Sequence, residues 1–216
     1  MKKSLSYACL FVLCSTTLLA QHRQGPRVVS TTESSAIHVP PQEAPESLRK
    51  IFSNLGKSGS DAYVAHQGWV VSGPHSGETQ EFIGMRFIPK FDSHVSQLRA
   101  AVQYAGFGAN RVNLSLYADL NGSPGTLLAG PVTITNLQPF GTCCTLAIAN
   151  FAPVAVTGGT PYWVVADTPL NGTGSDFAGA WDFVVPVIPQ AFNGGNGWFL
   201  QDENRSVAGD VRGTIP

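Results

Sequence analysis

The sequence predicts an all-β protein, an antiparallel two-sheet sandwich of the jelly-roll kind. Only 12% of its 216 residues are charged, while it holds 23 glycines and 15 prolines. That composition suits short strands joined by tight turns better than amphipathic helices. Short apolar runs recur between Gly, Pro, Asn and Asp clusters, at the spacing typical of sandwiches.

Individual strands are predicted from apolar runs with a period of two. The clearest run places Val112, Leu114 and Leu116 on one face and polar residues on the other, which indicates a half-buried antiparallel strand. Residues 45–55 could form a short helix. The expected strands are 62–71, 81–88, 95–104, 111–118, 132–135, 145–149, 161–166, 180–185, 197–201 and 207–214.

The segment 119–125 reads as a tight turn. Asp119 and Asn121 can cap it with their side chains, Gly122 can take positive φ, and Pro124 can fix the returning strand. Asp119 and Asn121 also resemble the opening of a calcium loop, but no glutamate stands near the twelfth place of such a loop. The pattern therefore favours the turn.

The N-terminus has the form of a secretory signal. Met1, Lys2 and Lys3 form a basic start, residues 7–20 are apolar, and Ala20 precedes a polar segment. The apolar run is shorter than the roughly 20 residues that a membrane-spanning helix needs. Cleavage after Ala20 is expected, giving a secreted protein, extracellular or periplasmic, with no membrane span after signal removal.

Two further regions are expected after the signal. Residues 21–47 are rich in Gln, Ser, Thr and Pro and read as a flexible spacer, and residues 48–216 form the sandwich domain. Removing residues 1–20 takes the 13 basic residues to 11 against 14 acidic ones, a formal charge of −3. Without a basic stripe the chain is not expected to bind nucleic acid.

Three segments carry a resemblance to a known family. They are 51–56, the predicted hairpin 116–129 and the segment 156–165. Together they resemble the secreted bacterial choice-of-anchor domains, over most of residues 51–216. The resemblance implies the sandwich architecture and says little about activity. Members commonly carry a surface-sorting tail after the domain; residues 213–216 show none, so the resemblance implies a released or periplasmic protein.

Two of the four cysteines are expected to leave with the signal, and the remaining pair is adjacent, Cys143 and Cys144. Neighbours on an ordinary strand point to opposite faces and cannot bridge. Two readings therefore stay open: a strained, reducible vicinal disulfide at a turn or bulge, or two small thiol residues, one buried and one half-exposed.

The tryptophans bear on ligand binding. Trp69 and Trp163 lie in apolar runs and are expected in the core, whereas Trp181 and Trp198 flank a Gly- and Asn-rich segment. An aromatic ring can stack on the C–H face of a sugar while amides and carboxylates take its hydroxyls. A glycan or another surface component is therefore the expected partner. The candidate ligand-binding residues are Trp181, Asp182, Asn193, Asn196, Trp198 and Asp202.

No catalytic constellation stands out, and no cofactor or metal is expected. The loops 56–60 and 73–77 miss the serine-hydrolase elbow, and His66, His75 and His94 lack paired-ligand spacing. One alternative is a structural or adhesive surface protein without a small ligand. The other is a secreted hydrolase that uses carboxylates, drawn from Asp176, Asp182, Asp202 and Glu203.

Overall fold

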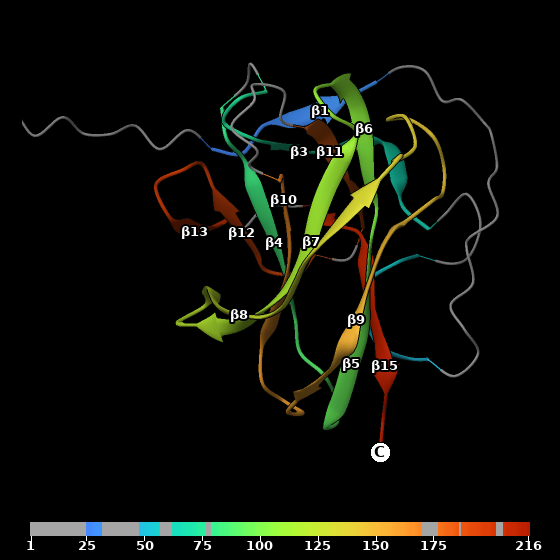
Figure 1. Cartoon of the computed structure of the whole chain (residues 1–216), viewed down its shortest axis with the longest axis vertical. Helices are drawn as coiled ribbons and strands as arrows, with labels where there is room; N and C mark the ends of the chain where they lie inside the picture. The colour runs from blue at the N-terminus through green and yellow to red at the C-terminus, as the bar shows by residue number, and fades with distance from the viewer. Residues whose placement is uncertain are drawn as a thin grey trace, which may run out of the picture.

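The computed structural model describes residues 25–31, 48–56, 62–76, 79–169, 177–185, 187–201 and 205–216 (Figure 1). Residues 1–20, which the sequence predicts to be a secretory signal, lie outside this described part of the chain. All described regular structure is β-strand, and every pair of strands is antiparallel. The predicted all-β, antiparallel sandwich is confirmed, and its jelly-roll topology stays a prediction.

The strands form three hydrogen-bonded sheets. The five-stranded sheet has the order β1-β3-β11-β14, with β6 also paired to β11; the six-stranded sheet has the order β13-β12-β4-β10-β7-β8; the four-stranded sheet has the order β2-β15-β5-β9. The bounds are β1 Val28–Ser30, β2 Arg49–Ser53, β3 Val64–Ser72, β4 Phe82–Phe87, β5 Ser93–Ala100, β6 Val102–Phe107, β7 Arg111–Leu120, β8 Ser123–Thr135, β9 Ala147–Val156, β10 Tyr162–Asp167, β11 Ala178–Val184, β12 Gln190–Asn193, β13 Trp198–Gln201, β14 Ser206–Val207 and β15 Gly209–Thr214.

The five- and four-stranded sheets join into one layer at two alanines. Ala101 separates β5 from β6, and Ala208 separates β14 from β15. Backbone hydrogen bonds run from Ala101 N to Ala208 O (3.0 Å), from Asp182 N to Ala101 O (2.9 Å) and from Ala208 N to Asp182 O (2.9 Å). The indole N–H of Trp181 donates to Ala208 O at 2.8 Å. The domain therefore has two layers.

The core lies between this joined layer and the six-stranded sheet. Trp69 of β3 packs edge-on against Phe192 of β12, with ring centroids 5.4 Å apart, and Phe52 of β2 lies 5.8 Å from Phe87 of β4. Both smaller sheets thus contact the same face of the large one. Aromatic burial of this kind supplies much of the hydrophobic stabilisation of a domain.

Several local predictions differ from the structure. Residues 49–53 form strand β2 and not part of a helix, because Ile51 is buried beside β15. Strand β1, at Val28–Ser30, lies within the expected spacer and pairs with β3; residues 32–47 are not described. The expected strand 95–104 is divided between β5 and β6, since Ala101 between them forms the sheet junction.

The predicted turn after β7 is confirmed. Asn121 (φ 54°) and Gly122 (φ 86°) both take the left-handed conformation, which makes a two-residue hairpin loop between Leu120 and Ser123. The Gly122 N–H donates to Asp119 Oδ2 at 2.9 Å. The aspartate therefore caps the turn, as its position in the sequence predicts.

One buried carboxyl group stands out in β11. Asp182 is 0% exposed, and neither of its carboxylate oxygens accepts a hydrogen bond from any described residue. Burial raises the pKa of Asp182 well above its usual range. Burial, and secondarily the charge of Asp182, also raises the pKa of the Tyr63 phenol. The group costs stability whenever it is ionised.

Replacing this group should change how stability depends on pH. A folded-state pKa above the unfolded value gives stability that is full below about pH 4 and is lost as pH rises through the folded pKa. We expect the free energy of unfolding of Asp182→Asn, measured by urea titration from pH 4 to pH 8, to fall less steeply with pH than that of the wild type. Equal slopes in the two proteins would contradict the prediction.

Candidate functional site

The structure separates the two tryptophans that the sequence places around a ligand. Trp181 lies in β11 of the five-stranded sheet and is 0% exposed, and Asp182 beside it is equally buried. Their side chains are enclosed because β11 is paired on both sides and covered on both faces. A ligand in solution cannot reach either one, so the candidate site is built without them.

Three other candidate residues lie together in the β12–β13 hairpin. Asn193 pairs with Trp198 across the hairpin, and Asn196 is exposed at its turn. The Gly195 N–H donates to Asn193 Oδ1 at 2.9 Å, which fixes the turn. Asp202 lies outside the described residues.

The alternation of the hairpin decides which way Trp198 faces. Phe192 and Phe199 pair across the hairpin with ring centroids 6.0 Å apart, and both pack on the main core. Since neighbours along a strand point to opposite faces, Asn193 and Trp198 stand on the outer face of the six-stranded sheet.

A second small core lies on that outer face. Its buried members are Trp163, Val165 and Ala191, and the half-buried rings of Tyr117 and Trp198 pack against it. The predicted burial of Trp163 is confirmed, at 0% exposed. The side chains that bury Trp163, however, lie on the outer face of the six-stranded sheet and not between the two layers. The outer surface of the six-stranded sheet around Tyr117, Trp163, Asp167, Asn193 and Trp198 is called the aromatic face below.

The β7–β8 hairpin covers part of this core. Register shifts along β7 and β8 mark bulges, which bend a strand pair. A Cβ atom on Gly84 of β4 would lie 3.1 Å from both Trp163 Cε3 and Pro124 Cγ. The indole ring of Trp163 therefore packs on the bare backbone of Gly84, which serves as the floor of this core. Pro124 of the bent hairpin packs against the same glycine. In Figure 1 the far end of this hairpin projects on the same side of the molecule as β12 and β13.

Asp119 ties the hairpin to the buried indole. Its Oδ1 accepts a hydrogen bond from Trp163 Nε1 at 2.8 Å, while its Oδ2 caps the turn. Arg86 Nε lies 3.8 Å from the same Oδ1, with both side chains partly exposed. One carboxylate thus fixes the turn and the ring orientation, and faces a cation at the edge of the aromatic face.

A polar track crosses the other end of the face. Thr133 Oγ1 donates to Asn113 Oδ1 at 2.8 Å, and Asn113 Nδ2 donates to Asp167 Oδ1 at 2.8 Å. Burial raises the pKa of Asp167 to about 6, while the hydrogen bond from Asn113 holds it lower. Burial, and secondarily the charge of Asp167, raises the pKa of Tyr117. Asp167 and Asn113 are therefore joined by a hydrogen bond on the same face of the sheet as the Tyr117 ring.

The catalytic alternatives gain little from the geometry. Of the four carboxylates weighed for glycoside hydrolysis, only Asp182 is described, and it is enclosed. His66, His75 and His94 are all exposed. In the described ranges no three His, Cys, Asp or Glu side chains gather where they could hold a metal ion. None of the described segments is a helix long and apolar enough to cross a membrane.

An apolar hollow elsewhere is a weaker candidate. It is lined by Phe91, Asp92, Ile215 and Pro216. The carboxylate there already accepts a hydrogen bond from Gly158 N at 2.8 Å. It offers a ligand little polar contact.

Comparison with protein-family models, with curated proteins and with solved structures finds no match to this chain. The resemblance to choice-of-anchor domains therefore stays a prediction.

Filling the floor under Trp163 should destabilise the second core. We expect Gly84→Val to lower the free energy of unfolding by about 1–3 kcal/mol, because the added methyl groups overlap Trp163 and Pro124. The control is Gly194→Val, where a Cβ meets nothing closer than 3.6 Å. Chemical denaturation followed by tryptophan fluorescence measures both; equal stability of the two variants would refute this packing.

The ionisation of Asp167 offers a second check. Carboxyl ¹³C shifts should show Asp167 titrating with a midpoint at about 6. In Asn113→Ala the midpoint should rise further, because the hydrogen bond that favours the carboxylate is lost. As its pKa is raised on folding, Asp167 favours the folded state in acid, and this contribution is lost as pH rises through about 6. A midpoint near 4 in the wild type would overturn the burial argument.

Proposed function

We propose that this chain is an exported, non-catalytic β-sandwich that binds a glycan or another surface component through the aromatic face. The observation that carries the proposal is the position of Tyr117 and Trp198, two half-buried rings on one side of the six-stranded sheet. Between them lies the buried Trp163, which holds the surface rigid.

The aromatic groups suit a flat, partly apolar ligand. Tyr and Trp give a large contact area with few rotatable bonds, and both carry a polar group that can face water or a ligand. Rings held by packing lose little entropy when a ligand binds. A pyranose ring offers a matching apolar C–H face, which makes sugars a fitting ligand class.

The polar groups suit the hydroxyls of the same ligand. Asn193 and Asp167 stand on this face, and Asn196 lies exposed at the neighbouring turn. Arg86 and Asp119 add a cation and an acceptor at the opposite edge. A few placed polar groups around an apolar surface are what fixes the orientation of a small ligand.

The remaining parts of the proposal come from the sequence. The basic and apolar start of residues 1–20 supports export. The non-catalytic part of the proposal also comes from the sequence, in which no catalytic constellation stands out. On this face Asp167 accepts a hydrogen bond from Asn113, and Asp119 accepts one from Trp163.

Glycan-array screening followed by titration of the best ligand tests the proposal. Tyr117→Ala and Trp198→Ala should each raise the Kd at least about tenfold, because central aromatic contacts carry most of the binding energy of such interfaces. Phe107→Ala is the control, since this ring is 63% exposed on β6, in the five-stranded sheet. Binding that survives both face variants, or that Phe107→Ala abolishes equally, would reject the aromatic face as the site.

A structural or adhesive role is the second candidate, and a patch at the edge of the aromatic face favours it. Leu120 is 62% exposed and Leu200 is 52% exposed, and a Cβ on Gly122 would lie 3.5 Å from Leu200 Cδ1. Leu200 thus lies against the β7–β8 turn, and exposed apolar groups that gather at one place are typical of protein contact sites. Self-association without ligand, abolished by Leu200→Ser, would favour this role over glycan binding.

A further inference from the structure

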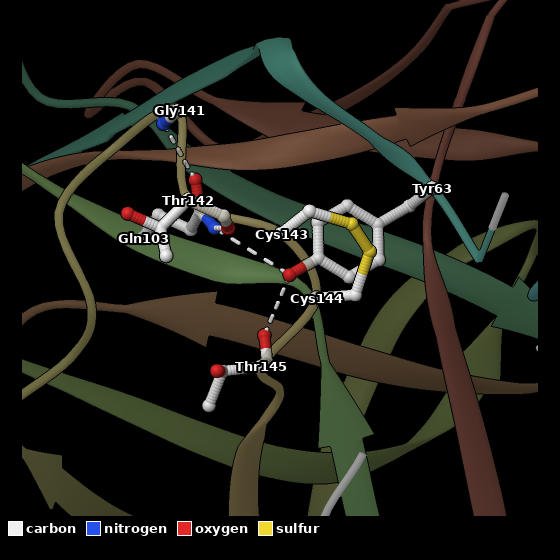
Figure 2. The surroundings of a disulfide bond; sticks show 7 residues. All are labelled: Tyr63, Gln103, Gly141, Thr142, Cys143, Cys144 and Thr145. Carbon is white, nitrogen blue, oxygen red and sulfur yellow. Dashed lines mark hydrogen bonds between the residues drawn. A yellow bond between two sulfur atoms is a disulfide. The ribbon is translucent and has the colours of Figure 1, made fainter. Parts of the chain in front are cut away.

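The loop between β8 and β9 carries a disulfide between neighbouring residues, Cys143 and Cys144 (Figure 2). Both residues lie outside the strands. Cys144 is 2% exposed and belongs to the main core, whereas Cys143 is only half-buried. One half of the bond thus faces the interior, while the other half belongs to a residue that solvent still reaches.

Two side chains from other parts of the fold hold the backbone on both sides of this disulfide. Gln103 of β6 donates from Nε2 to Thr142 O and accepts at Oε1 from Gly141 N at 2.9 Å. Tyr63, just before β3, donates from its hydroxyl to Thr145 O at 2.8 Å. Figure 2 shows both side chains reaching the loop, with the hydrogen bonds of Gly141 to Gln103 and of Tyr63 to Thr145 drawn as dashed lines.

The two holding groups are themselves fixed. Gln103 is 0% exposed and Tyr63 is 4% exposed, and Gln103 Nε2 lies 3.4 Å from the Tyr63 hydroxyl. Buried polar groups joined in this way form a rigid network. The network is hydrogen-bonded to the backbone of residues 141–145, the segment that contains the disulfide. A shift of that backbone would therefore change these hydrogen bonds.

This disulfide is poorly placed to serve as a staple of the fold. A cross-link stabilises a protein mainly by restricting the unfolded chain, and its effect grows with the length of the closed loop. A bond between neighbouring residues closes the shortest possible loop. Opening it therefore leaves the unfolded chain almost as free as before. Cys144 is one small residue of a large core, so we expect the domain to stay folded when the bond opens.

We propose that Cys143–Cys144 is a reversible thiol–disulfide exchange site whose substrates are dithiols and their disulfides, and that Tyr63 and Gln103 report its state to the fold. The site is separate from the aromatic face, so it stands or falls independently of glycan binding.

A thiolate of the dithiol attacks Cys143 Sγ and forms a mixed disulfide with it, while the Sγ–Sγ bond between Cys143 and Cys144 breaks and the Cys144 thiolate takes up a proton. The second thiol of the reagent then loses its proton and attacks the mixed disulfide, which releases Cys143 as a thiolate that is protonated in turn. The dithiol is oxidised to its disulfide, and the chain gains two electrons and two protons. A disulfide reagent reverses both steps.

The two states must differ at the loop. Bonded sulfurs lie about 2 Å apart, whereas two thiols have to separate to non-bonded contact. Because Cys144 is enclosed by the core, the separation displaces the backbone around it. This displacement lengthens or breaks the hydrogen bonds of Gly141 and Thr142 to Gln103.

The test uses the intact oxidised chain in buffers of graded reduced and oxidised dithiothreitol, at native pH and without denaturant. Alkylation and peptide mass mapping should show Cys143 and Cys144 becoming labelled together, with tryptophan emission unchanged. Hydrogen exchange of the Gly141 amide should be at least about tenfold faster in the reduced protein. The Cys143→Ala/Cys144→Ala double variant should show the fast exchange in every buffer.

A point variant tests the coupling. Tyr63→Phe keeps the ring and removes the donor to Thr145 O, so the equilibrium constant for reduction should rise about fivefold, the equivalent of one net hydrogen bond. The proposal is overturned if the disulfide is reduced only once the chain unfolds. It is equally overturned if reduction leaves the Gly141 exchange rate unchanged.

Discussion

Hydrogen bonds at one short junction hold the two smaller sheets in a single layer, and the rest of the fold depends on them. Ala101, Asp182 and Ala208 exchange backbone bonds there, and Trp181 adds its indole N–H. The junction turns five and four strands into one surface that can cover a six-stranded sheet. Ala101 and Ala208 stand where the strands change partners, and both are 0% exposed.

The same junction explains why Trp181 is unavailable to a ligand. In sequence this residue stands near glycines and asparagines, which suggested a surface position. In space its strand is the centre of the five-stranded sheet and is paired on both sides. Composition along the chain reports local flexibility, whereas burial here follows from strands that are distant in sequence. No single-sequence pattern contains that pairing.

The sequence predicted well where the determinants are local. The alternation of Val112, Leu114 and Leu116 placed these residues in the core, and the Asn121–Gly122 pair gave the hairpin turn. Prediction failed where tertiary contacts decide. Strand β12 has only four residues, and the opposite face of β7 is buried at Asn113 by contacts with β8 and β10.

About half of the candidate site could be read from the chain. Trp198 and Asn193 were found because they flank a glycine-rich turn. Tyr117, Asp167 and Arg86 were not, since they come from three other strands and meet only through sheet register. Their polar character on otherwise apolar strands was the one available signal, and it does not say which strands are neighbours.

The second core gives the domain an unequal resistance to opening. It is small, lies outside the two main layers and is closed partly by the tip of one hairpin. Regions with few buried contacts open locally at a lower free energy than the whole domain. We therefore expect the tip of the β7–β8 hairpin, which Asp119 and Pro124 hold against this small core, to open at a lower free energy than the two layers.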